Sequence, residues 1–412
     1  MVEFAAVEIA ATADRGNVLR ATRDIKPRET VLVEKPIFAT KFTNNIAKAY
    51  GDFCQLPGAV QDEILGSFFC PMGSKEASRR LRHASSLAPE DRDRAARFMT
   101  IMSFNAVEQT PVIMDTKGRD PKILHKGQTL ALLRMASKAS HCCAPNAFWY
   151  VRDDGRAQVI RSTTAIRKGD EVTITYLEEK KLLLPTDKRR HLLWQQKEFT
   201  CCCLRCAAED EDTCIFQCSS AGCPGQWCLR RSGGASACLS CSFVPSESDL
   251  AFAENQETEL QHQLDFCDAV ERGLHEDTDA RVLALKPLHA RHHLTHRLAS
   301  RQHAAHTRAG RHAEAVHALH LVVQCRLELP ATCKSRAAAW GLEMLGHALK
   351  RAGDPFGAAD AYNRACAVHL VIQDSSHPYV LYCKQVLLAS VSELPPIHAG
   401  VADMDIDLHA MD

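Results

Sequence analysis

The chain has 412 residues, more than the roughly 250 to 300 that usually share one hydrophobic core, so two or more packed units are expected. Hydrophobic residues make up 46% of the chain, and 50 basic residues balance 50 acidic ones, which excludes an overall field that attracts nucleic acid or anionic membranes. A membrane span needs roughly 18 to 20 uncharged apolar residues, and no such run exists; the opening Met1-Val2-Glu3-Phe4 also lacks a signal-peptide layout, so we expect a cytoplasmic or nuclear protein.

The first predicted elements are short strands. Residues 3–40 alternate apolar and polar side chains, as at Val31 and Val33, with glycine or proline at the breaks. From about residue 41 to 107 the apolar residues recur at helical spacing, for example Val60 and Ile64, which predicts a helical insertion. Residues 123–176 return to short strands.

Three short motifs follow one another in the middle of the chain. Ser-His-Cys-Cys-Ala-Pro-Asn occupies residues 140–146, Gly-Asp-Glu-Val-Thr-Ile-Thr-Tyr residues 169–176, and Phe-Thr-Cys-Cys-Cys-Leu-Arg-Cys residues 199–206. One cysteine from the first motif and the CxCxxC of the third could supply four thiolates to one zinc ion. Such an ion would hold a distant loop beside a strand that ends in tyrosine.

Cysteine is concentrated in one region: ten of the nineteen cysteines fall between Cys201 and Cys241. In a large chain without a signal peptide this favours metal ligands over disulfides. Residues 207–250 have little periodicity, so metal rather than a hydrophobic core is expected to order them. The spacing of the cysteines in this segment resembles that of a zinc ribbon, and the predicted ligands are Cys218, Cys223, Cys238 and Cys241. Cys214 and Cys228 are competing ligands. The alternative is that these cysteines are loop thiols that bind no metal.

Residues 251–412 are predicted to be helical. Small residues at helix contacts and glycine at the turns, as at Gly310 and Gly353, are typical of tetratricopeptide-like helical hairpins. Histidines are frequent from His289 to His320, some of them four residues apart. No aligned acidic ligand accompanies them, and we expect a solvated helix face there instead of a metal site.

The three motifs resemble those of the SET-domain protein lysine methyltransferases, and most closely those of the SET and MYND family. The family's Asn-His-Ser-Cys-x-Pro-Asn is similar to residues 140–146, its Gly-Glu-Glu-Leu-x-x-x-Tyr to residues 169–176, and its Phe-x-Cys-x-Cys-x-x-Cys to residues 199–206. The segment from Arg15 to Ile25 resembles the cofactor-binding opening of the family. Over residues 1–40 and 100–206 the resemblance rests on sequence motifs. Over the rest of the chain it rests only on the order of the predicted segments.

This resemblance implies an α+β protein with a β-rich, pseudoknotted SET fold over residues 1–206. The helical insertion lies at about 41–107, the zinc-bound post-SET segment at 199–206, a zinc-ribbon-like segment at 207–250, and an all-α tetratricopeptide-like domain at 251–412. The family's MYND module needs seven or eight Cys and His ligands, but the only cysteines of the insertion are Cys54 and Cys70. The chain therefore resembles a member without the MYND module.

The resemblance also implies S-adenosyl-L-methionine as methyl donor and Tyr176 as the catalytic residue, whose hydroxyl orients the amine and the methyl group. Tyr176 alone would more often be a buried strand tyrosine, and Asn105 could equally be a residue that ends a helix. The implied cofactor-binding residues are Arg15, Asn17, Asn105, Ser140, His141, Tyr176 and Phe199. The implied ligands of the first zinc ion are Cys143, Cys201, Cys203 and Cys206.

The chain departs from the family at Ser140, where the family has asparagine, and at Val18, where it has glycine. A serine hydroxyl is shorter than an asparagine amide and would leave a buried cofactor atom poorly paired, at a cost of about 1 to 3 kcal/mol.

The favoured function is methylation of lysine side chains of histone or non-histone proteins by a monomer. The alternative is a degenerate SET scaffold that binds protein partners. Direct nucleic-acid binding is disfavoured by the neutral charge and the lack of interleaved basic and aromatic residues.

Overall fold

The structure, a computed structural model, describes residues 1–41, 46–116, 122–125, 127–152, 155–271, 277–286 and 288–392. The chain forms two compact units. The first contains Met1–Tyr176, Trp194–Phe199 and Leu370–Tyr382, and the second contains Leu177–Leu193, Thr200–His369 and the chain from Cys383. Within the described ranges, no helix combines the length and the apolar character that crossing a membrane requires. The end of the predicted C-terminal domain, residues 393–412, lies outside these ranges.

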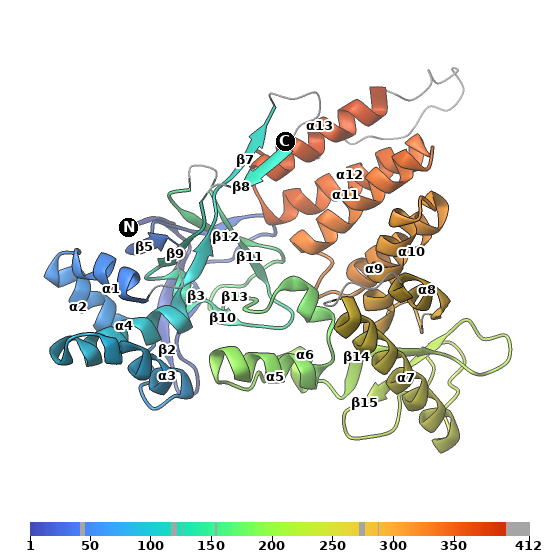
Figure 1. The fold of residues 1–412 in the computed structure, drawn as a ribbon, viewed down its shortest axis with the longest axis horizontal. Helices are drawn as coiled ribbons and strands as arrows, with labels where there is room; N and C mark the ends of the chain where they lie inside the picture. Colours follow the sequence, from blue (N-terminus) through green and yellow to red (C-terminus); the bar gives the residue numbers. More distant parts are fainter. Residues whose placement is uncertain are drawn as a thin grey trace. The chain divides into compact units, whose positions relative to one another are not determined.

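The first unit is built from short strands (Figure 1). Four of them form one antiparallel sheet in the order β1-β4-β12-β11, and β10 pairs with β13 in parallel. The strands are β1 (Val2–Ala5), β2 (Val7–Thr12), β3 (Gly16–Ala21), β4 (Thr30–Glu34), β5 (Phe38–Lys41), β6 (Val107–Gln109), β7 (Val112–Asp115), β8 (Lys122–His125), β9 (Thr129–Leu132), β10 (Ser140–His141), β11 (Ala147–Val151), β12 (Gln158–Ser162) and β13 (Thr173–Ile174).

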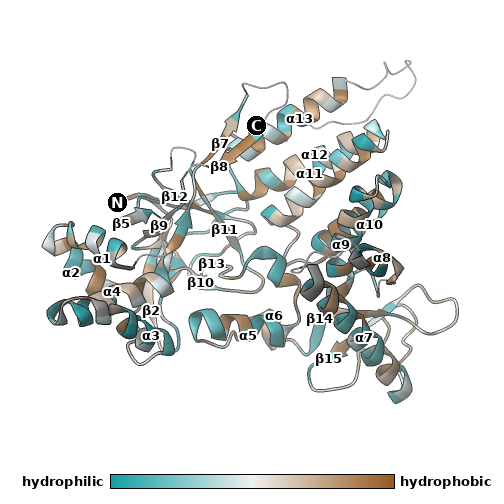
Figure 2. Ribbon diagram, viewed as in Figure 1, coloured by the Kyte–Doolittle hydropathy of each residue, from teal (hydrophilic) through white to brown (hydrophobic). Residues whose placement is uncertain are grey.

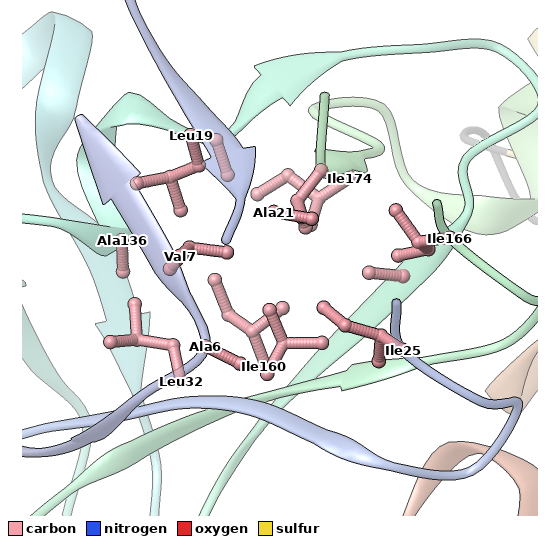
Figure 3. Close-up of a cluster of buried hydrophobic side chains, with 14 of the residues drawn as sticks. Ala6, Val7, Leu19, Ala21, Ile25, Leu32, Ala136, Ile160, Ile166 and Ile174 are labelled. Atoms are coloured by element: carbon pink, nitrogen blue, oxygen red, sulfur yellow. The ribbon is translucent and has the colours of Figure 1, made fainter. Parts of the chain in front are cut away.

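Hydrophobic side chains from several strands make the core of this unit (Figure 3). Leu19 comes from β3, Leu32 from β4, Ile160 from β12 and Ile174 from β13. Each is at most 5% exposed, and burying such a side chain contributes about 1.5 to 3 kcal/mol. The core thus joins the N-terminal strands to the strand that precedes Tyr176.

Helices follow β5, where the apolar spacing predicts them. They are α1 (Ile46–Cys54), α2 (Gly58–Ser67), α3 (Lys75–His83) and α4 (Pro89–Asn105), with 3₁₀ turns at Ala84–Ser86 and Ala136–Lys138. The longest, α4, begins with Pro89 and has Glu90 and Asp91 in its first turn, both of which favour a helix N-terminus. The helices share a core in which Phe53 and Phe98 stack at 4.3 Å between ring centres.

The second unit is mainly helical after a small hairpin. Its elements are the 3₁₀ turn Glu179–Leu183, α5 (Thr186–Lys197), α6 (Leu204–Ala207), β14 (Asp210–Gln217), β15 (Gln226–Arg230), α7 (Glu247–Glu271), α8 (Asp277–Ala284), α9 (His293–Arg308), α10 (His312–Glu328), α11 (Arg336–Arg351), α12 (Pro355–Ile372) and α13 (Pro378–Ser392). The last residues of α5 and α12 and the first of α13 belong to the first unit. The C-terminal region is helical, as predicted.

Helix α10 packs against both α9 and α11, and α11 lies beside α12 (Figure 1). Each of the four helices carries both hydrophilic and hydrophobic residues (Figure 2). Gly310 and Gly353 adopt positive φ angles of 69° and 82° in the turns that join them, a conformation that glycine accepts without strain. At Gly346 an added Cβ would lie 2.5 Å from the ring of Tyr362. Glycine therefore allows α11 and α12 to approach closely.

The cysteine-rich segment contains more regular structure than its sequence predicts. Strands β14 and β15 pair antiparallel, and Phe216 stacks on Trp227 at 4.9 Å between ring centres. Both rings are buried with Ala253 of α7. The expectation that metal alone orders this segment is therefore wrong, because these aromatic side chains give it a small hydrophobic core.

Candidate functional site

The first two motifs are joined by backbone pairing in the first unit. Ser140 of β10 pairs with Thr173 of β13, and His141 pairs with Ile174. The side chain of Asn146 reinforces this pairing, because its Nδ2 donates to the carbonyl of Glu171 at 2.8 Å while its Oδ1 accepts from the backbone N–H of Thr173, also at 2.8 Å. Asn146 lies within the first motif, but its residue type and position there do not predict this role.

Tyr176 follows β13 and is held by hydrogen bonds at both ends. Its backbone N–H donates to Nδ1 of His141 at 3.0 Å, and its hydroxyl donates to the carbonyl of Ala139 at 2.7 Å. Burial, with a contribution from the nearby Glu171 charge, raises the pKa of Tyr176 to about 12. The phenol is therefore neutral near pH 7 and suited to orient a reacting group.

Three rings of predicted site residues form an aromatic cluster, which we define as His141, Tyr176 and Phe199. The ring centres lie 5.5 Å apart for His141 and Tyr176, 6.1 Å for His141 and Phe199, and 6.3 Å for Tyr176 and Phe199. The last two rings meet edge to face at 87°, an arrangement that aromatic pairs prefer. The cluster joins residues from all three motifs within the first unit.

Lys197 lies beside the aromatic cluster and was missed by the sequence analysis. Its Nζ is 5.9 Å from the ring centre of Tyr176 and donates to the carbonyls of Ser103 at 3.2 Å and Phe104 at 2.9 Å. Burial lowers the pKa of this lysine. Nothing in its sequence context distinguishes Lys197 from the solvated lysines of a helix end.

The remaining predicted cofactor residues differ in their surroundings. Arg15 forms an ion pair with Glu171 at 2.6 Å, and Asn17 is exposed on β3. Asn105 is buried at the end of α4, where its Nδ2 donates to the carbonyls of Phe69 and Ile101, both at 2.8 Å.

Glu171 has one carboxylate oxygen that is not satisfied. Its Oε2 pairs with Arg15, but Oε1 is buried and has no hydrogen-bond partner among the described residues. Such orphaned acceptors are rare in folded proteins, and they often mark a site where an unseen group binds. Because Glu171 also acts on the pKa of Tyr176, this acceptor belongs to the same site.

The thiols of the CxCxxC segment are brought together in the second unit. The Sγ atoms of Cys201, Cys203 and Cys206 lie within 4.8 Å of one another. Arg190 of α5 holds this segment by donating to the carbonyls of Cys201 at 2.9 Å and Cys206 at 3.1 Å.

Cys143, the predicted fourth ligand, belongs to the first unit, so the four-thiolate site stays a prediction. There, its Sγ lies 3.3 Å from Nε2 of His141. Since Nδ1 of this ring accepts the Tyr176 N–H, a neutral ring carries its proton on Nε2 and directs it toward the sulfur.

The second predicted set of ligands also converges. The Sγ atoms of Cys218, Cys223, Cys238 and Cys241 lie within 4.8 Å of one another. Backbone N–H groups approach these sulfurs, and hydrogen bonding from Cys241 lowers the pKa of Cys238 to about 6. Four converging thiols are the donor set of a structural zinc site. Of the two competing cysteines, Cys228 instead contacts the hydroxyl of Ser236 at 3.3 Å.

The histidine-rich segment is not a uniformly solvated face, and that expectation is wrong most clearly at two positions, while His289, His296, His303 and His306 are partly buried. His292 is 0% exposed and His293 is 6% exposed. They begin α9, and their rings stack at 4.8 Å between centres. His312, His317 and His320 are exposed, as predicted. Sequence spacing could not separate the two groups, because burial depends on contacts with elements distant in the sequence: the ring of His292 lies 5.0 Å from that of Phe216 in β14.

Comparison with known proteins matches the region that contains the first two motifs. Residues 16–177 match the family model of the SET domain, which is less than half of the chain. No curated protein matches the sequence. Among solved structures, the SET domain of LSMT bound to lysine and AdoHcy is similar with a TM-score of 0.33 and 10% identity, over 95% of this chain and 88% of that one. Rubisco LSMT bound to AdoMet gives a TM-score of 0.28 and 11% identity, over 78% and 87%.

The family model spans β3, β10 and β13, and it includes both His141 and Tyr176. The paired motifs and the hydrogen bonds that fix Tyr176 therefore lie inside the matched region. The chain contains a SET domain.

Proposed function

We propose that the protein is an S-adenosylmethionine-dependent protein-lysine N-methyltransferase in which Tyr176 is the catalytic residue. The observation that supports this most is the position of Tyr176 in the matched SET region, where its backbone and hydroxyl are both fixed by hydrogen bonds. Within the SET proteins we assign the chain to the SET and MYND branch, as a member that lacks the MYND module.

The residues around Tyr176 suit the proposed cofactor. The orphaned Oε1 of Glu171 offers an acceptor for an ammonium or hydroxyl group, and the rings of His141 and Phe199 offer surfaces for a nucleobase. We assign cofactor binding to these rings together with Arg15, Asn17, Asn105 and Ser140. When bound, the cofactor supplies an electrophilic methyl group on its sulfonium.

The role of Tyr176 follows from its protonation and its hydrogen bond. Because its pKa is about 12, the phenol stays protonated, and because its proton points to the carbonyl of Ala139, the oxygen keeps lone pairs free to accept from a substrate amine. A fixed acceptor lowers the barrier by orienting the amine rather than by removing its proton. The substrate amine must reach the site neutral.

We further propose that both cysteine groups bind structural zinc, because four thiolates leave no open coordination position. Cys143, Cys201, Cys203 and Cys206 would tie the first motif to the segment that follows Phe199. The substrate would be a lysine of a histone or non-histone protein, and the helical C-terminal region, which we interpret as tetratricopeptide-like, would contribute to its binding.

The test is transfer of a labelled methyl group from S-adenosylmethionine to lysines of a protein extract, with Tyr176→Phe as the variant. We expect wild-type labelling on lysine and a loss of about 100- to 1,000-fold in Y176F. Y176F should still bind the cofactor in calorimetry, which separates a loss of methyl transfer from a loss of binding. Zinc-loaded wild-type protein that binds the cofactor and labels nothing would contradict the proposal.

A second candidate function is a protein-binding scaffold, and two observations favour it. Ser140 replaces the asparagine of the family pattern, and the Lys197 ammonium lies beside Tyr176, where it would repel a cationic sulfonium. Calorimetry separates the candidates, because a scaffold need not bind S-adenosylmethionine.

A further inference from the structure

Four metal-ligating side chains that belong to neither cysteine group meet in the second unit. Cys214 lies on β14, Glu257 on α7, and His292 and His293 at the start of α9. One ligand atom from each lies within 4.8 Å of the other three. Cys214 and both histidines are buried, and the side chain of Glu257 is 22% exposed. The sequence pattern does not predict this cluster, because its members come from three separate elements.

The contacts inside the cluster converge on Glu257. Nε2 of His293 lies 3.0 Å from Oε1, and Nε2 of His292 lies 3.9 Å from Oε2. The two imidazoles therefore present the same ring nitrogen to one carboxylate. Burial lowers the pKa of both histidines, so both rings are in the neutral form that can ligate a metal.

A second, independent observation points to a missing ligand. Nε2 of His292 is buried and has no hydrogen-bond partner within the described part of the chain. At 3.9 Å, Oε2 of Glu257 is too far to be one. A buried polar atom without a partner is strongly disfavoured, and this one is aimed into a group of sulfur, nitrogen and oxygen donors.

The donor set selects the class of ion. A thiol and two imidazoles are poor ligands for Ca²⁺ and Mg²⁺, which prefer oxygen, whereas zinc takes sulfur, nitrogen and carboxylate oxygen in tetrahedral sites. We propose that Cys214, Glu257, His292 and His293 form a third metal site, which binds a zinc-like divalent cation. With four protein ligands and no open position, the site would be structural and would join β14 to α7 and α9.

Binding changes the protons of three ligands. Nε2 of His293 carries the proton that it donates to Oε1 of Glu257 at 3.0 Å, and this proton moves to Nδ1 when Nε2 coordinates the metal. Cys214 releases its thiol proton to solvent as the sulfur bonds to the metal. Nδ1 of His292 accepts from the backbone N–H of Leu294 at 3.2 Å. Coordination through Nε2 moves the ring proton to Nδ1, so this hydrogen bond is replaced by the metal–nitrogen bond. This hydrogen bond caps the N-terminus of α9, and the free energy lost with it is small compared with that gained by coordination to zinc.

The experiment measures the metal content of the full-length protein after dialysis against a weak chelator. We expect Cys214→Ser and Glu257→Gln each to bind one metal ion fewer per chain than the wild type. Cys325→Ser is the matched control, because this buried thiol of α10 lines a pocket with His292 and His293 but lies outside the cluster. It should keep the full content. The difference between variants does not depend on occupancy of the other two sites.

X-ray absorption at the zinc edge keeps the test decisive if C214S fails to fold. Two four-cysteine sites contribute only sulfur neighbours, so nitrogen and oxygen neighbours in the wild type indicate the mixed site, and E257Q should reduce their signal. An all-sulfur wild-type spectrum, or equal metal content in wild type, C214S and E257Q, would overturn the proposal.

Discussion

The backbone N–H of Tyr176 donates to Nδ1 of His141 at 3.0 Å, and this hydrogen bond joins the histidine of the first motif to the tyrosine that ends the second. His141 also approaches Cys143 through its other nitrogen, at 3.3 Å. The imidazole therefore lies between the proposed catalytic residue and a proposed zinc ligand. It acts as a positioning residue as well as part of the proposed cofactor site.

Replacing His141 by alanine should destabilise the first unit and displace Tyr176. The Tyr176 N–H would lose its acceptor, and leaving a buried donor unpaired costs about 1 to 3 kcal/mol. We expect the free energy of unfolding in urea to fall by this amount. His262→Ala, at an exposed position of α7, should change it little. Equal stability of H141A and H262A would show that the hydrogen bond contributes nothing.

The ammonium of Lys197 predicts a pH dependence of stability. Burial lowers its folded-state pKa below the ordinary value of 10.5. Between these two values the unfolded chain binds more protons than the folded chain, so the contribution of Lys197 to the free energy of unfolding rises with pH across this window. Below the window its burial as a cation disfavours folding.

The measurement compares wild type with Lys197→Met in urea at a series of pH values up to 10.5. The stability of the wild type relative to K197M should increase with pH. Lys75→Met, which changes an exposed lysine at the start of α3, should show no such trend relative to the wild type. A constant difference between wild type and K197M would contradict the lowered pKa.

Much of the fold could be predicted from periodicity. The strands before residue 41, the helices α1 to α4 and the helical C-terminal region all appear where apolar spacing indicates them, because each buries one regular face. Hairpin β14–β15 was missed, since charged residues at its start and cysteines along it conceal the buried pair Phe216 and Trp227.

The candidate site could be predicted only where its residues lie in motifs. His141, Tyr176 and Phe199 were identified in this way, and the structure brings their rings together. Lys197 lies outside the motifs, and Glu171 lies in the second motif without a predicted role, because the importance of both depends on which carbonyls and charges surround them after folding. The same holds for Cys214 and His292, whose neighbours are distant in the sequence.

Packing between α11 and α12 predicts a large effect of a small substitution. An added methyl at Gly346 would lie 2.5 Å from the ring of Tyr362, which is 1% exposed and cannot move away easily. Gly346→Ala should therefore lower the free energy of unfolding by about 1 to 3 kcal/mol. Gly66→Ala in α2, where a Cβ meets nothing within 4 Å, should be neutral or stabilising. A stable G346A would mean that the two helices separate at little cost.

The cysteine group around Cys238 gives a prediction that separates metal binding from backbone strain. A Cβ at Gly225 would lie 2.5 Å from Sγ of Cys238, and the N–H of Gly225 donates to Sγ of Cys223 at 3.3 Å. Gly225→Ala should therefore displace two of the four ligands and lower the bound zinc by one ion per chain.

Gly222 has a φ of 72° but open space around its Cα, so Gly222→Ala introduces strain without displacing a sulfur. We expect G222A to keep its zinc and lose about 1 to 2 kcal/mol of stability. If G225A retained the wild-type zinc content in native mass spectrometry, these four thiols would not be a metal site.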